Sequence, residues 1–360
     1  MTSRGLRLLI GLAAAVIALV GIGRVSSIAG PAFLALVLTI AVSPIRSRLR
    51  RRGARPWVVV AVPLAVVFLV LLAFGAALVV AVAQLAAVLP GYTANYQALL
   101  ADAGQLVRQL GVTTDQINAV IGQLDPNKLL SLVQSFLTGL LDVGTAFVLV
   151  VLLLVGMSLD AAVLQDGVRA LESTRPHLVD ALREFVRSTL RYLVVSSVFG
   201  LVVAVLDAVA LWLLGVPLPL LWGLLAFITN YIPNIGFVIG LVPPALLALL
   251  DSGWVTMVWV IVVYSALNFV IQSLIQPRFT GKSAGLSTTI TTLSLLVWTV
   301  VLGALGAILA VPLSAFARAL LVDADPGTRW AIPLVSGRAA ARPERLRRPG
   351  GRSGRRRSSP

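Results

Sequence analysis

Cysteine is absent from the 360-residue sequence, and histidine occurs only once, at His177. Without cysteine the chain can form no disulfide, no reactive thiolate and no cysteine-ligated metal site. One histidine excludes H-E-x-x-H and other multi-histidine metal motifs. His177 follows Pro176 in an arginine-rich segment, where a structural role is expected, so no histidine is left for a serine triad. We therefore expect no enzyme, no metal and no cofactor.

Charged residues are also scarce, at 12% of the chain against 58% hydrophobic residues. A typical soluble domain has about 25% charged residues. No Asp, Glu, Lys or Arg occurs in 56–101 or in 283–317, and Asp207 and Asp251 are the only ones in 192–277. Each of these stretches is longer than the roughly 20 apolar residues that cross a bilayer as a helix. The sequence therefore predicts an all-α polytopic membrane protein.

The charge that is present is mostly positive, with a formal net charge of +15 at pH 7. The arginines lie in short loops and near the chain ends: residues 46–55 contain six and no acid, and residues 338–360 contain nine. Positive residues mark the cytoplasmic loops of membrane proteins. This distribution predicts a membrane protein with both termini in the cytoplasm. Its arginines are expected to contact anionic lipids, and no nucleic-acid partner is expected.

Changes in composition divide the chain into five parts. These are N-terminal transmembrane helices (1–91), a small helical extracytoplasmic insertion (92–140), a transmembrane helix with a cytoplasmic amphipathic segment (141–191), a transport core with broken helices (192–322) and a disordered arginine-rich cytoplasmic tail (323–360). The first part begins with apolar runs at 8–20 and 28–45, which we expect to form an uncleaved helical hairpin.

The number of crossings depends on how the broken segments are interpreted. One crossing for each long apolar stretch gives about eight transmembrane segments. That count places Arg278 and Lys282 outside the cell, against the positive-inside rule. Interrupted or re-entrant helices in the C-terminal half would change the count, and both alternatives stay open here.

The apolar stretch 229–244 contains residues that break helices beside residues that bind ligands. They are Asn230, Pro233, Asn234, Gly236 and Gly240. Proline removes a backbone donor and glycine adds conformational freedom, and at membrane depth the freed backbone groups need protein or a water-filled cavity. Small residues also serve close helix packing. The two amides favour the alternative, a ligand site at a discontinuous helix.

A second polar group follows it in the chain. Asn268, Gln272 and Gln276 are spaced by four residues and share one helix face. The segment 287–292 then opens the last apolar stretch with hydroxyl side chains. Those assigned to the site are Ser287, Thr288 and Thr291. Such hydroxyls can also bond back to helix carbonyls, so a second re-entrant element and simple local bonding are equal alternatives.

Asp207 is an acid well inside an apolar segment. Ionisable residues at membrane depth are costly and usually functional. Asp207 is therefore either a carrier of a proton or cation or an interfacial residue, if its helix ends early.

Three motifs in the second half resemble those of the autoinducer-2 exporter-like permeases. They are Asn230-x-x-Pro233-x-x-Gly236, Gln276-Pro277-x-x-x-Gly281 and Gly303-x-x-Gly306 followed by Pro312. Ser287-Thr288 stands where that family commonly has a His-Pro pair. The resemblance implies secondary transport without ATP by a homo-oligomeric, multi-pass protein. Members of the family are linked to export of a furanone-type signal and to exchange of sodium or lithium for protons.

Three hypotheses follow. The first is a permease that exports a small solute bound by the amides and hydroxyls of the two broken segments. The second is a Na⁺(Li⁺)/H⁺ antiporter that uses Asp207. The third is a non-transporting membrane scaffold whose arginine tail binds anionic lipid or a partner.

Overall fold

The computed structural model describes residues 4–92, 95, 147–160, 163–164, 166–233, 235–276, 287–325 and 327–328. Within these ranges the regular elements are all helices. Five are long and apolar enough to cross a membrane and four shorter ones are apolar. The expectation of an all-α polytopic membrane protein is confirmed. Most of the expected insertion (92–140) and the tail from 329 onward lie outside the described residues.

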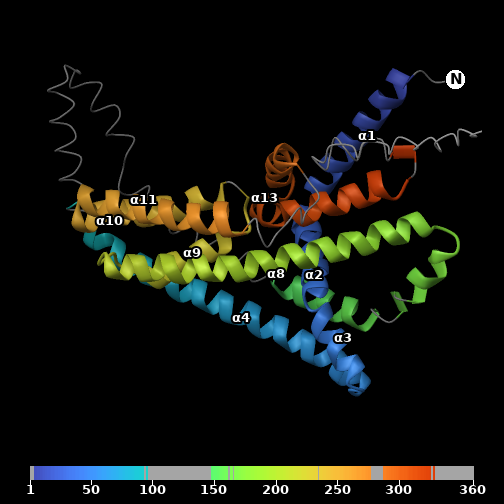
Figure 1. Ribbon diagram of the computed structural model, residues 1–360, viewed down its shortest axis with the longest axis horizontal. Helices are drawn as coiled ribbons and strands as arrows, with labels where there is room; N and C mark the ends of the chain where they lie inside the picture. The colour runs from blue at the N-terminus through green and yellow to red at the C-terminus, as the bar shows by residue number, and fades with distance from the viewer. Residues whose placement is uncertain are drawn as a thin grey trace, which may run out of the picture.

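The chain begins with three helices that follow one another in the same direction: α1 (Arg4–Arg24), α2 (Ser26–Ala41) and α3 (Ser43–Arg51). Figure 1 shows them end to end, from the N-terminus to the arginine-rich end of α3. The expected hairpin of 8–20 and 28–45 is wrong. Only Val25 separates α1 from α2, and the Ile28 N–H bonds to the Val25 carbonyl. A helical hairpin needs a loop of about 2–5 residues, so this junction bends without reversing.

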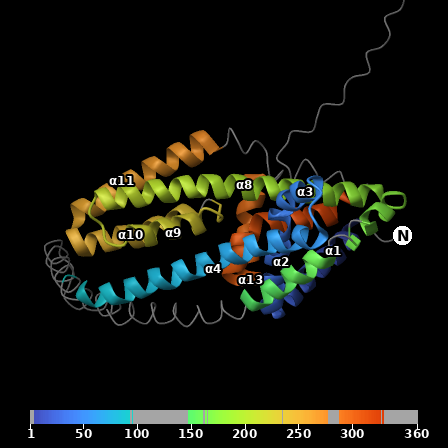
Figure 2. The same ribbon diagram turned by 90° about the horizontal axis from the view of Figure 1, so that it is seen from below.

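Two long helices set the length of the molecule. They are α4 (Pro56–Val88), followed by the short η1 (Leu89–Tyr92), and α8 (Pro176–Leu213). Figure 2 shows both running along the long axis. The 38 residues of α8 span about 57 Å, well beyond the roughly 30 Å of a bilayer core. Its first turns carry Arg183 and Arg187, paired with Glu172 and Glu184, so α8 combines the amphipathic segment with the membrane-spanning one.

The stretch full of helix breakers forms a hairpin between α9 (Pro219–Thr229) and α10 (Gly236–Ser252). The 11 residues of α9 reach only about 16 Å, too short for a crossing. After the turn at 230–235, α10 runs back beside α9, and both helices pack with α8 and α11 (Trp254–Asn268) around Trp222, Ala248 and Tyr264. The expectation of interrupted helices in the C-terminal half is confirmed here.

A second reversal lies inside α13 (Thr288–Arg318), which continues into η3 (Ala319–Asp323). Gly303 has φ 64° and ψ −144°, which is not a helical conformation. Trp298 Nε1 donates to Ser314 Oγ at 2.9 Å, although the two residues are 16 positions apart. In a straight helix they would be about 24 Å apart. The two arms of α13 therefore fold against each other, and Ile232 from the first turn packs against them.

The α9–α10 hairpin changes the membrane count. It starts and ends at the same end of the helix bundle (Figure 2), so it contributes no net crossing. Counted in this way, the C-terminal half has one crossing fewer, which is the re-entrant alternative that the sequence left open. α11 runs back toward the end of the bundle at which α8 and its arginines begin (Figure 2). Arg278 and Lys282 themselves lie outside the described residues.

Candidate functional site

The turn of the first hairpin is held against α8 by polar contacts. The Tyr192 hydroxyl donates to the Tyr231 carbonyl at 2.8 Å, and the hydroxyls of Tyr231 and Ser197 are 2.6 Å apart. The Asn230 side chain donates to the Ser196 carbonyl at 2.9 Å. These bonds satisfy groups that the break in the helix exposes. The turn is thereby fixed to the membrane-spanning part of α8.

Glycines make this close approach possible. A Cβ on Gly236 would overlap the carbonyl oxygen of Thr229, and one on Gly200 would lie 2.9 Å from the Asn230 amide nitrogen. A Cβ on Gly240 would lie 3.1 Å from the Thr229 hydroxyl. Gly236 and Gly240 therefore allow α10 to approach α9, and Gly200 allows the turn to approach α8.

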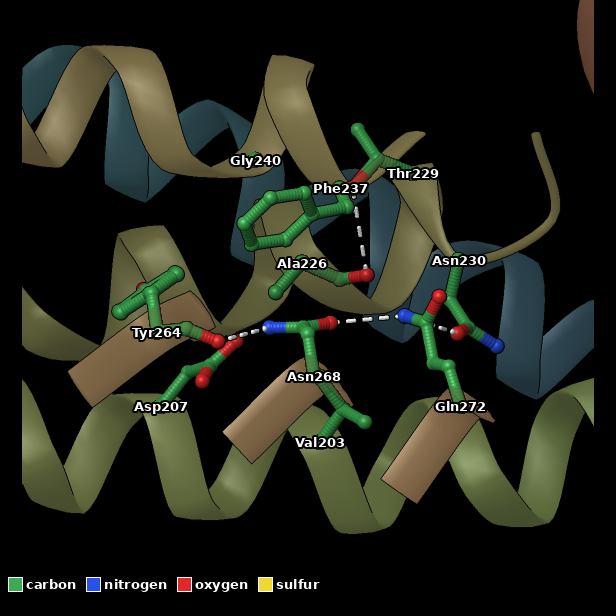
Figure 3. Close-up of a pocket in the computed structure, with 10 residues that line it drawn as sticks. All are labelled: Val203, Asp207, Ala226, Thr229, Asn230, Phe237, Gly240, Tyr264, Asn268 and Gln272. Carbon is green, nitrogen blue, oxygen red and sulfur yellow. Dashed lines mark hydrogen bonds between the residues drawn. The ribbon is translucent and has the colours of Figure 1, made fainter. Parts of the chain in front are cut away.

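A chain of amides connects α11 to the turn. The Gln272 amide donates to Asn268 Oδ1 at 2.7 Å and to Asn230 Oδ1 at 3.4 Å, and the Asn268 amide donates to the Tyr264 carbonyl at 2.9 Å. Gln272 lies in η2 (Phe269–Ile275), a π-helical continuation of α11. Figure 3 shows these side chains pointing toward one another from α11, η2 and the hairpin.

Asp207 lies beside this chain of amides. It is 1% exposed, and neither carboxylate oxygen has a hydrogen-bond partner in the described part of the chain. The buried Tyr264 hydroxyl has no hydrogen-bond partner there either. Figure 3 shows Asp207 on α8 directed at Tyr264 and Asn268. Asp207 is therefore buried within the helix bundle, and its role as a carrier or as an interfacial residue stays a prediction.

These groups enclose a cavity of about 10 Å³, which is close to the minimum that one water molecule needs. Its lining comprises Val203, Asp207, Ala226, Thr229, Asn230, Phe237, Gly240, Tyr264, Asn268 and Gln272. The oxygen atoms of a carboxylate, amides and hydroxyls are the ligands that hard cations prefer. The arrangement can hold a proton on the carboxylate or a small cation among these oxygens.

Several residues assigned to the site from the sequence lie elsewhere. Ser287 caps α13 by accepting the Ile290 N–H at 3.3 Å, and the Thr291 hydroxyl donates to the Ser287 carbonyl at 3.0 Å. Pro233 lies in the turn and Gln276 follows η2, and neither lines the cavity. Asn234 and the side chain of Thr288 lie outside the described residues. Ligand binding by the residues assigned to the site from the sequence stays a prediction.

Five lining residues were not assigned to the site from the sequence: Val203, Ala226, Thr229, Phe237 and Tyr264. Tyr264 carries a signal that could have identified it, since it precedes Asn268 by four residues and shares its helix face. Thr229 directly precedes Asn230 at the break. Phe237 has no polar group and is set apart only by packing.

Comparison with known proteins gives a consistent result. The sequence matches the model of the AI-2E family transporters over residues 8–324. YhhT of Escherichia coli (strain K12), named as a candidate transport protein, is 28% identical over 339 residues, covering 94% of this chain and 97% of YhhT. The AI-2 transport protein TqsA of the same strain is 28% identical over 334 residues, covering 93% and 97%. YrrI of Bacillus subtilis (strain 168), another candidate transport protein, is 32% identical over 143 residues, covering 40% and 38%.

Proposed function

Since the chain belongs to the AI-2E family of transporters, we propose that it is a secondary transporter in which Asp207 binds the coupling ion, a proton or a small monovalent cation. The observation that carries this proposal is the buried Asp207 carboxylate, which has no hydrogen-bond partner in the described chain. It faces a cavity lined by uncharged amide and hydroxyl side chains, whose oxygen atoms can coordinate a cation. The chain is a multi-pass membrane protein. We place it in the bacterial inner membrane, as its family favours, with residues 46–55 and 338–360 in the cytoplasm, as their arginines favour.

The energetic argument starts from the cost of the charge. An ionised carboxylate away from water is strongly unfavourable unless it is paired. Arg and Lys are absent from the cavity lining, and Asp207 forms no ion pair within 4 Å in the described chain. Asp207 is therefore stabilised when it takes up a proton or when a cation binds beside it. A single carboxylate that accepts one or the other exchanges them, which is the elementary step of an antiporter.

The cavity size favours ion binding over solute binding in this conformation. Sites for organic ligands usually measure about 300–1,000 Å³, far above the volume of about 10 Å³ here. A small organic solute could reach Asn230 and Gln272 only after the hairpin separates from η2. Export of such a solute, driven by the ion at Asp207, is the second candidate. It is favoured by the name of the relative TqsA, an AI-2 transport protein.

The test uses purified protein in liposomes that contain a pH-sensitive dye. A sodium or lithium jump outside should change the internal pH in the wild type. Asp207→Asn should abolish this change, and the matched variant Asp166→Asn, which removes an exposed acid, should keep it. Size-exclusion elution of each variant verifies folding. An unchanged response of Asp207→Asn would overturn the proposal.

The scaffold hypothesis has its own test. If the protein only bound lipid or a partner through its tail, deletion of residues 338–360 would abolish its cellular role, while Asn230→Ala would not. We expect the reverse. Assembly as a homo-oligomer stays a prediction.

A further inference from the structure

A second cavity lies at the arginine-rich end of the molecule. Its volume is about 410 Å³, within the range of about 300–1,000 Å³ for small-molecule sites. The lining is Ser43, Pro44, Arg46, Ser47, Arg50 and Leu190. Leu190 precedes Asp207 by 17 positions on α8, about 25 Å along the helix axis, so this cavity is separate from the site above.

Arg46 is the unusual residue in this cavity. It is 7% exposed, its Nη2 donates to Ser158 Oγ at 3.3 Å, and its Nε has no partner in the described chain. No carboxylate among the described residues lies within 4 Å of Arg46. Arg50 is close enough to repel it. A buried guanidinium beside a second positive charge is costly without a counter-charge, so an anion bound beside Arg46 would stabilise it.

We propose that this cavity binds a phosphate group, from the headgroup of an anionic phospholipid or from soluble phosphate. The planar guanidinium presents several N–H donors in a fixed fork that matches phosphate oxygens. Arg46, Arg50 and the Ser43 hydroxyl supply donors to the cavity. The Ser47 hydroxyl contributes less, because it donates to the Pro44 carbonyl at 2.9 Å.

The position of the cavity favours the lipid source. The apolar span that contains α2 and α3 runs from Ser26 to Arg51, and the cavity lies near its end, so a bilayer crossed by this span would bring its headgroups close to the cavity. Exposed apolar side chains of the neighbouring α4, including Val62 and Val66, offer a surface for acyl chains. A bound headgroup would connect α3 with α8 and stabilise the fold in anionic membranes.

The test is the melting temperature of the purified protein in a neutral detergent, followed by tryptophan fluorescence. Dioctanoyl-phosphatidylglycerol should raise the melting temperature of the wild type and dioctanoyl-phosphatidylcholine should not. If inorganic phosphate raises the melting temperature and dioctanoyl-phosphatidylglycerol does not, the cavity binds soluble phosphate and not a lipid headgroup. Arg46→Gln should weaken the apparent affinity at least about tenfold, as expected for a lost hydrogen bond between charged groups.

Arg52→Gln is the matched control, because Arg52 is exposed and does not line the cavity. It should respond as the wild type does. If Arg46→Gln fails to fold, Arg50→Gln replaces it and should also weaken binding. Equal responses of Arg46→Gln and the wild type, equal losses in Arg46→Gln and Arg52→Gln, or equal stabilisation by the two lipids would each overturn the proposal.

Discussion

The α9–α10 hairpin depends on the absence of a side chain at Gly236. A Cβ there would overlap the carbonyl oxygen of Thr229, a backbone atom that cannot rotate away. Overpacking costs about 1–3 kcal/mol, and the upper end applies because the backbone must move. Alanine returns about 1 kcal/mol through its higher helix propensity. We therefore expect Gly236→Ala to destabilise the protein by about 2 kcal/mol.

Thermal unfolding in detergent tests this expectation, since about 2 kcal/mol corresponds to a fall in Tm of roughly 3 °C for a chain of 360 residues. Gly240→Ala is the control within the hairpin. Its Cβ would meet the Thr229 hydroxyl at 3.1 Å, a side-chain atom that can give way, so a smaller fall is expected. Gly21→Ala faces open space and should not lower Tm. A Gly236→Ala protein as stable as Gly240→Ala would refute the reasoning.

Three further variants test separate parts of the structure. Gln272→Leu leaves two asparagine side chains without their donor and should weaken sodium-driven proton flux about tenfold, measured in liposomes. Tyr92→Phe removes the 2.6 Å bond to Asp251. Burial, that bond and the charge of Asp251 raise the pKa of Tyr92 to about 12, so the bond is complete below about pH 10 and is lost only as the pH rises through 12. The fall in Tm should thus be equal at pH 6 and pH 9. Trp298→Phe deprives Ser314 of its donor and should lower Tm by a few degrees.

Much of the hairpin could be predicted from local chemistry. Pro233 and Gly236 interrupt any regular helix, and asparagine beside such a break indicates polar contacts there. Likewise, the four-residue spacing of Asn268 and Gln272 places both amides on one face, where the structure has them hydrogen-bonded to each other. Both features depend on residues that are close together in the chain, so they can be predicted from the sequence.

The position of Asp207 could not be predicted in the same way. Its distance to Tyr264 and Asn268 depends on how α8 packs against α11, two helices far apart in the chain. The sequence predicts that the Asp207 carboxylate lies in an apolar helix, but it does not predict which residues of other helices lie beside it. Ser287 could be understood from the sequence alone, because its hydrogen bonds are to nearby residues of α13. They match the alternative of simple local bonding. The predicted hairpin at Val25 was wrong, because two apolar runs in a sequence do not reveal how few residues separate the two helices.

The central claim is that Asp207 exchanges a proton for a cation, and the most direct measurement is proton release on cation binding. Purified protein in a weakly buffered detergent solution is mixed with sodium chloride or lithium chloride, and a pH indicator records the released protons. We expect proton release that saturates with cation concentration in the wild type and none in Asp207→Asn. Choline chloride is the control for ionic strength and should release none from either protein. Equal proton release by the wild type and Asp207→Asn would show that Asp207 does not exchange a proton for a cation.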